Sequence, residues 1–369
     1  MKQEQRYICR FLLAAAMLLV TACTNDSEEK EGQLVTVLPY SASFFETNPM
    51  TRALPTGYVR YSELYPTTTP DHTTISLKLK RDNEDEENSI VRYVNNKWTA
   101  TIDLEDATYY IYGFMPNGFA SGMTLAKNGG SYANGAIMTI NNLNVLTPAD
   151  VCAVVGVKGG TEPANIEDVG IQLGQFNFLG HATEDNYLYL LLKHLYAGLH
   201  FKLHIDSEYA KLRTIKVKRL TLTTVNEIYD RINLVVTLSA NNDNTDPCTS
   251  ITYTDITANA QQKASTDLYN NSAGFTLPIS TSESVLGCFA PGKCNQFELE
   301  SVYDIYDKKG NLIRQDCRAK NSIDLPALLG SDYTELAAGE IYTIDLKIQP
   351  TYLYTLSDKD LDNPSFVIE

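Results

Sequence analysis

The segment Leu34-Val35-Thr36-Val37-Leu38 lies near the start of the chain, between an acidic run and a polar loop. It is short, apolar and rich in valine, a composition typical of a β-strand. An acidic run, Asp26 to Glu31, precedes it, and the loop Asn48-Pro49-Met50-Thr51-Arg52-Ala53 follows it. That loop carries a single basic residue among polar neighbours, which is where proteolytic cutting is best tolerated.

We therefore predict a removable first strand, which folds into a β-domain and is released by a cut after Arg52, before Ala53. Lys30 precedes the strand, so a cut there would not release it, and Arg60 lies inside another predicted strand. The residues assigned to the removable strand are Leu34, Val35 and Val37.

A targeting segment precedes the strand. Positive charges at Lys2, Arg6 and Arg10 are followed by an apolar run, Phe11 to Val20, that is too short to span a bilayer. The next three residues, Thr21-Ala22-Cys23, resemble the lipobox of bacterial lipoproteins, in which the cysteine becomes diacylated. We expect lipidation at Cys23; the alternative is a plain secretory signal with an incidental cysteine.

Length and composition favour an all-β protein of two domains. The chain has 369 residues, enough for two units of roughly 150 residues that each bury a core. Its 23 tyrosines and frequent Thr and Val favour strands. A net charge of −15 argues against nucleic acid or an anionic membrane surface as a partner, so we expect membrane attachment through lipid alone.

Runs of alternating apolar residues predict the strands. The cleanest alternation is Leu199, Phe201, Leu203 and Ile205, and Phe297 to Cys317 has the pattern of a hairpin. Short helical turns are predicted at Ser207–Leu212 and Leu325–Leu329, and the Asn/Thr/Asp-rich stretch 240–272 is predicted to be a long loop. The predicted divisions are a signal peptide (1–22), a propeptide (23–52), two antiparallel β-sandwiches (53–187 and 188–350) and a tail (351–369).

The cysteines and histidines give no strong metal or disulfide signal. Outside the leader, Cys152, Cys248, Cys288, Cys294 and Cys317 are odd in number and lack zinc spacing, although Cys288 and Cys294 flank a turn and could pair. His194, His200 and His204 share strand parity and could form a metal patch, but a solvated strand face is the better interpretation. We predict no metal and no cofactor.

The last nineteen residues contain exposed apolar alternation, which is unusual at a chain end because it invites pairing with another molecule. Either this tail packs on its own domain or it is a strand donated to a neighbour. The candidate donor residues are Tyr352, Tyr354, Leu356, Phe366 and Ile368.

Motifs of enzymatic chemistry are missing from the sequence: it has no nucleophile elbow, HExxH, P-loop or dinucleotide fingerprint. Asp and Glu are plentiful, but nothing places two of them together as a glycosidase pair. We predict a protein without enzymatic activity.

The order of these features resembles the fimbrillin family of Bacteroidetes, whose members build type V pili. The resemblance is carried by the lipobox at Cys23, the loop at Arg52-Ala53, and two strand motifs, Tyr109-Tyr110-Ile111-Tyr112-Gly113-Phe114-Met115-Pro116 and His194-Leu195-Tyr196-Ala197-Gly198-Leu199-His200-Phe201. It implies two transthyretin-like sandwiches, export as an outer-membrane lipoprotein, trimming by an Arg-specific surface protease, and polymerisation with other pilus subunits by strand exchange.

Two questions stay open from the sequence. A stalk subunit would need both a groove and a donor tail, whereas a tip subunit would need only the groove. The rival class is a lipid-anchored glycan-binding or nutrient-capture lipoprotein, which would keep its lipid, escape cutting at Arg52 and bind saccharide.

Overall fold

A computed structural model describes residues 32–42, 58–60, 74–81, 87–160, 170–180, 186–279, 283–330, 337–350 and 364–368. Strands dominate these residues, so the predicted all-β fold class is confirmed. Among the described residues, no helix has both the length and the apolar character needed to cross a membrane.

The largest sheet has nine strands and contains the apolar segment Leu34 to Leu38. Its main order is β10-β12-β1-β5-β4-β3-β6-β11, with β2 paired to β1. Because β6 also pairs with β10, through Met115–Cys152 and Phe114–Ala153, the sheet closes on itself. The strands are β1 (Gln33–Ala42), β2 (Tyr58–Arg60), β3 (Ile75–Lys80), β4 (Glu87–Val94), β5 (Lys97–Ile102), β6 (Thr108–Met115), β10 (Cys152–Gly160), β11 (Asn177–Leu179) and β12 (Asn186–His194).

A second sheet packs against the same core and draws strands from both halves of the chain. Its order is β16-β15-β8-β7, with strands β7 (Gly122–Asn128), β8 (Ser131–Asn144), β15 (Arg231–Ser239) and β16 (Cys248–Asp255). A short 3-10 helix, η2 (Asn117–Phe119), precedes β7. Leu234 of β15 lies opposite Ile140 of β8, so a hairpin from the second half of the sequence completes the first core.

The remaining strands form two sheets around a second core. One has the order β22-β21-β13-β18-β9 and the other β17-β14-β19-β20. The strands are β9 (Leu146–Thr147), β13 (Ala197–Ile205), β14 (Thr214–Thr224), β17 (Ser265–Thr276), β18 (Glu283–Phe289), β19 (Gln296–Tyr306), β20 (Leu312–Asp324), β21 (Ile341–Pro350) and β22 (Pro364–Ile368).

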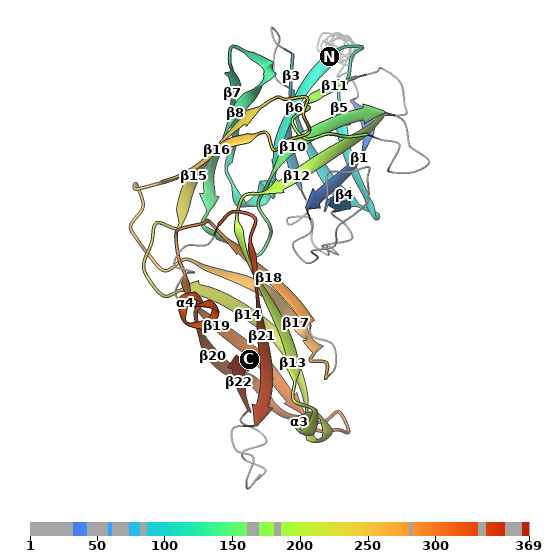
Figure 1. The fold of residues 1–369 in the computed structure, drawn as a ribbon. Coiled ribbons are helices and arrows are strands. Elements are labelled where there is room, and N and C mark those ends of the chain that lie inside the picture. Colours follow the sequence, from blue (N-terminus) through green and yellow to red (C-terminus); the bar gives the residue numbers. More distant parts are fainter. Residues whose placement is uncertain are drawn as a thin grey trace, which may run out of the picture.

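Figure 1 shows the two groups of sheets as the upper and lower parts of the molecule, joined where β12 runs into β13. Each group encloses its own cluster of buried side chains. The predicted boundary at 187/188 lies within β12, which pairs with β1 and β10 in the first group.

Local signals are confirmed where they act over a few residues. Helices α3 (Ser207–Leu212) and α4 (Leu325–Leu329) lie at the predicted positions, and the preceding Asp206 and Asp324 cap them by accepting backbone N–H bonds. The predicted hairpin is β19–β20, with Gly310 at φ +87° in its turn.

Two expectations differ from the structure. The stretch 240–272 is not a single loop, because it contains β16 and the first part of β17. Both are edge strands with largely exposed side chains, which explains why their sequences are polar. The sheets are also not wholly antiparallel: β1 runs parallel to β12, and β13 runs parallel to β21.

Candidate functional site

The first strand, β1, is an interior strand of the closed sheet. Val35 and Val37 are fully buried and Tyr40 is 1% exposed, whereas Leu34 is 65% exposed. This alternation follows from the two-residue period of side chains along a strand. Of the three residues predicted to form the removable strand, two face the core and Leu34 faces away from it.

Both edges of β1 carry backbone ladders. Along one edge, Val35 to Ser41 pair in parallel with Asn186 to Leu192 of β12. Along the other edge, Gln33 to Val37 pair with β5, and the end of β1 pairs with β2. The strand is therefore hydrogen-bonded on both sides, which is the arrangement of a central strand rather than an edge.

Loss of β1 would open a groove one strand wide. Its walls would be β5 and β12, separated by about two strand spacings, or roughly 10 Å, and each would present unpaired backbone groups. The floor would be the apolar core from which Val35 and Val37 had been withdrawn. The two walls would then be connected round the rest of the sheet through the short β6–β10 pairing. Such a groove has the width, ladder groups and apolar floor that an incoming strand requires.

The other predicted site residues are only partly covered by the structure. Cys23, Arg52 and Ala53 lie outside the described residues, as do Tyr352, Tyr354 and Leu356. Phe366 and Ile368 are in β22.

The end of the tail is not presented to a neighbour in this structure. Strand β22 pairs antiparallel with β21, so that Phe366 lies opposite Ile348 and Ile368 lies opposite Leu346. It forms the outer edge of the sheet β22-β21-β13-β18-β9 (Figure 1). Residues 364–368 thus pair within the chain, and donation of the tail to a neighbour stays a prediction.

The cysteines and histidines are arranged differently from the sequence expectations. Cys288 and Cys294 do not form a disulfide; both are free thiols. His194 ends β12 and is buried, so it does not lie on a solvated face. His200 is on β13, where burial, followed by the charge of Lys202, lowers its pKa. The three histidines thus belong to two strands in two different sheets. Their odd or even positions in the sequence could not show this, because the change of strand at residues 195–196 is not visible in that pattern.

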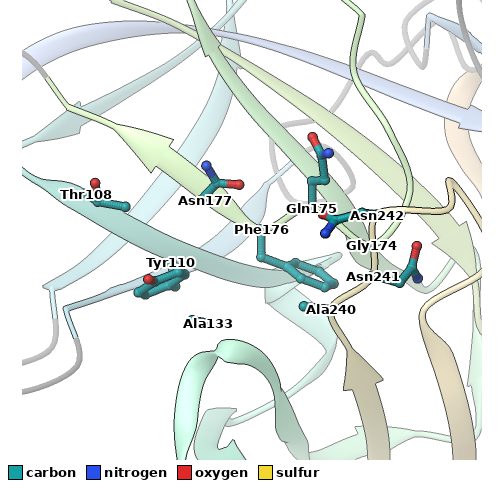
Figure 2. A pocket seen from close by; sticks show the side chains of 10 residues that line it. All are labelled: Thr108, Tyr110, Ala133, Gly174, Gln175, Phe176, Asn177, Ala240, Asn241 and Asn242. Atoms are coloured by element: carbon teal, nitrogen blue, oxygen red, sulfur yellow. The ribbon is translucent and has the colours of Figure 1, made fainter.

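A pocket of about 260 Å³ opens on the first group of sheets. Figure 2 shows the rings of Tyr110 and Phe176 among its lining side chains, with Asn177 and Gln175 on one side and Asn241 on the other. None of its ten lining residues carries a charge: Thr108, Tyr110, Ala133, Gly174, Gln175, Phe176, Asn177, Ala240, Asn241 and Asn242.

The walls of this pocket are held by fixed contacts. Phe176 stacks on Tyr112 with ring centroids 4.7 Å apart. Asn241 accepts hydrogen bonds from the backbone N–H groups of Asp243 and Thr245, so its loop is ordered. Gly174 has φ +79°, and a Cβ there would lie 2.3 Å from Asn241 Nδ2, so only glycine allows the two walls to approach. Sequence reasoning missed the pocket because its walls come from segments far apart in the chain.

Comparison with known proteins gives structural likenesses only. No protein-family model matches the sequence, and no curated protein matches it. A candidate cell adhesion protein from Bacteroides uniformis aligns over 94% of this chain and 99% of its own, at 10% identity and a TM-score of 0.35. A second one, from Bacteroides fragilis, aligns over 91% and 97%, at 11% identity and a TM-score of 0.37. A fimbrial protein from Bacteroides vulgatus covers 92% and 98%, at 11% identity and a TM-score of 0.29. These scores are too low for the likenesses to indicate a function for this chain.

Proposed function

We propose that this chain is a structural subunit of a surface fimbrium, exported as an outer-membrane lipoprotein, cut after Arg52 and polymerised by strand exchange in surface adhesion. The observation that most supports this is the position of β1. It is an interior strand with buried Val35 and Val37, yet it lies wholly between the predicted lipidation site Cys23 and the predicted cutting site.

The assembly would be driven by a change in how β1 is held. While the chain is intact, the tether through residues 43–57 gives β1 a high effective concentration at its groove, and no second molecule competes. A cut after Arg52 by an Arg-specific surface protease would remove that advantage. A strand from another subunit could then occupy the groove between β5 and β12, restoring the ladders and covering the core.

Mass spectrometry of subunits isolated from native fibres would test this function. The expected mature N-terminus is Ala53, without β1 and without lipid. Fibres built from chains that still carry an acylated Cys23 would contradict the proposal, because β1 would then still fill the groove.

The role within the fibre depends on the tail. Because residues 364–368 pair with β21, the tip role, which receives a strand and donates none, is favoured over the stalk role. Deleting residues 351–369 is therefore expected to leave incorporation into fibres unchanged, since the groove lies in the other group of sheets. Immunogold labelling of fibres made with the truncated chain would measure this. Fibres that stop growing, with a truncated chain whose melting temperature is unchanged, would instead assign the stalk role.

A second candidate function, saccharide binding, is favoured by the pocket of Figure 2. Uncharged amide and hydroxyl groups beside an aromatic ring are suited to a neutral sugar, whose hydroxyls exchange hydrogen bonds and whose apolar face packs on the ring. This candidate corresponds to the glycan-capture class and does not require a cut at Arg52.

Tyr110→Ala is expected to weaken saccharide binding by this pocket, because the half-buried ring is part of its lining. Titration calorimetry with neutral oligosaccharides should show a fall in affinity of at least about tenfold. This corresponds to about 1.4 kcal/mol of binding free energy, which we expect for the loss of one aromatic contact. Tyr306→Ala, at a half-buried tyrosine of β19 in the second group of sheets, is the matched control. Wild-type protein that binds none of the sugars would reject this candidate.

A further inference from the structure

A buried cluster of three potential metal ligands lies where the chain passes from one core to the other. Asp150 closely precedes β10, Cys152 is the first residue of β10, and His194 is the last residue of β12. Among the described residues, these three form the only group of His, Cys and carboxylate side chains whose ligand atoms all lie within 4.8 Å of one another.

Strand geometry explains why the three side chains converge. Cys152 lies directly opposite His194 in the antiparallel pairing of β10 with β12. Asp150 is two residues before Cys152, and its Oδ2 atom accepts a hydrogen bond from Cys152 Sγ. The junction that follows is fixed by Leu195 N–H donating to Val151 O over 2.7 Å.

The distances within the cluster fit a small cation. Asp150 Oδ2 lies 2.5 Å from His194 Nδ1 and 3.0 Å from Cys152 Sγ, and Sγ lies 3.5 Å from Nδ1. These three atoms lie on a circle of radius about 1.8 Å, so an ion about 1.1 Å above their plane would be about 2.1 Å from each of them. Zinc binds nitrogen and oxygen at about that distance and sulfur at about 2.3 Å, in tetrahedral geometry, which sets its ligand atoms about 3.3–3.6 Å apart. The Sγ–Nδ1 separation already has this value, whereas Asp150 Oδ2 would have to move by roughly 1 Å away from His194 Nδ1 when the ion binds.

The charge of the cluster also calls for compensation. The side chain of Asp150 is 0% exposed and that of His194 is 4% exposed. Asp150 Oδ1 is buried without a hydrogen-bond partner. A buried carboxylate is costly unless it is paired, and a divalent cation would satisfy it more fully than one imidazole does.

The arrangement is not that of a nucleophilic cysteine with its base. Both the thiol and the carboxylate approach the same imidazole nitrogen, Nδ1, whereas a catalytic relay uses the two ring nitrogens separately. Burial, and next to it the charge of Asp150, raises the pKa of the Cys152 thiol, which disfavours a free thiolate.

We propose that Asp150, Cys152 and His194 bind one zinc ion, with a water or another group in the fourth position. Mixed sulfur, nitrogen and oxygen ligands suit zinc better than magnesium or calcium. On binding, the Sγ–H proton is released, and the proton between His194 Nδ1 and Asp150 Oδ2 leaves that contact, so that the neutral imidazole binds through Nδ1 and carries its proton on Nε2. Because the site is closed to solvent, the ion would enter during folding, and it would tie the loop before β10 to the end of β12. This inference is independent of the proposed fibre function.

The full-length wild-type chain tests this proposal without any variant. It would be produced with zinc supplied, passed through a desalting column, and examined by native mass spectrometry, with about one zinc per chain expected. Refolding with Co²⁺ in place of zinc should give a sulfur-to-cobalt charge-transfer band. Folded wild-type protein with well below one ion per chain, or cobalt bound without that band, would overturn the proposal in favour of a hydrogen-bonded cluster without metal.

Variants would then assign the ligands. Cys152→Ser should remove the charge-transfer band, and His194→Gln should lower the metal content. Cys317→Ser is the matched control, because this half-buried thiol lies on β20 in the second group of sheets, and it should keep both signals. Loss of the band in Cys317→Ser but not in Cys152→Ser would place the metal elsewhere and refute the assignment.

Discussion

The Arg52→Ala variant is expected to accumulate as a lipid-bearing monomer that forms no fibres. With the loop intact, β1 stays tethered between β5 and β12, and its effective concentration, of millimolar order for a short flexible tether, exceeds that of any free subunit. Immunoblots of boiled and unboiled cell extracts would measure the outcome. They should show one band heavier than the mature chain, and no ladder of polymers.

The matched control is Arg60→Ala. Arg60 belongs to β2, whose backbone pairs with the end of β1, and a position held in a strand is a poor protease site. This variant should be cut and assembled as wild type is. Normal polymer ladders from Arg52→Ala would show that the strand is released at another position or not at all.

Val37→Asp is expected to lower the free energy of unfolding of the intact chain by at least about 3 kcal/mol. The substitution removes a fully buried apolar side chain, worth about 1.5–3 kcal/mol, and adds a carboxylate in a core without a partner for it. Urea unfolding followed by circular dichroism would measure the loss as a lower midpoint at constant slope.

Leu34→Asp provides the comparison on the same strand. Its side chain is 65% exposed, so the change should stay within about 0.5 kcal/mol. A matching pair of synthetic strands, residues 32–42 with and without Val37→Asp, should differ in the same direction when added to a chain that lacks β1. Equal effects of the two substitutions would mean that β1 does not contribute Val37 to the core.

The elements that could be predicted from the sequence are those fixed by neighbouring residues. The alternation of Val35 and Val37 identifies β1. The pair Asn95-Asn96 forms the turn between β4 and β5, where both residues have positive φ, a conformation that asparagine adopts readily. Asp206 and Asp324 mark the starts of the two short helices.

Pairings between distant segments could not be predicted in this way. Nothing local to β15 indicates that it joins β8, some ninety residues earlier, because a strand of alternating apolar residues fits any sheet with an apolar face. For the same reason nothing in the sequence around the predicted boundary at 187/188, which lies within β12, indicates that this strand pairs with β1.

The candidate sites divide along the same line. The strand β1 could be predicted because the alternation of its apolar residues is local to the sequence. The cluster of Asp150, Cys152 and His194 could not, because Cys152 and His194 become neighbours only through the register of β10 with β12. These two residues are 42 positions apart in the sequence, so their spacing does not resemble that of a metal-binding motif.

The continuity of β12 and β13 has a mechanical consequence. Only Leu195 and Tyr196 stand between these strands, and each strand lies parallel to a partner, β1 in one case and β21 in the other. A force along the direction of β12 and β13 would load all the backbone hydrogen bonds of each parallel ladder at the same time. In peeling, by contrast, these bonds would be broken one after another. In the proposed fibre, tension would therefore pass from one core to the other along the backbone of β12 and β13, and the strand paired with β12 would determine how much force this connection withstands.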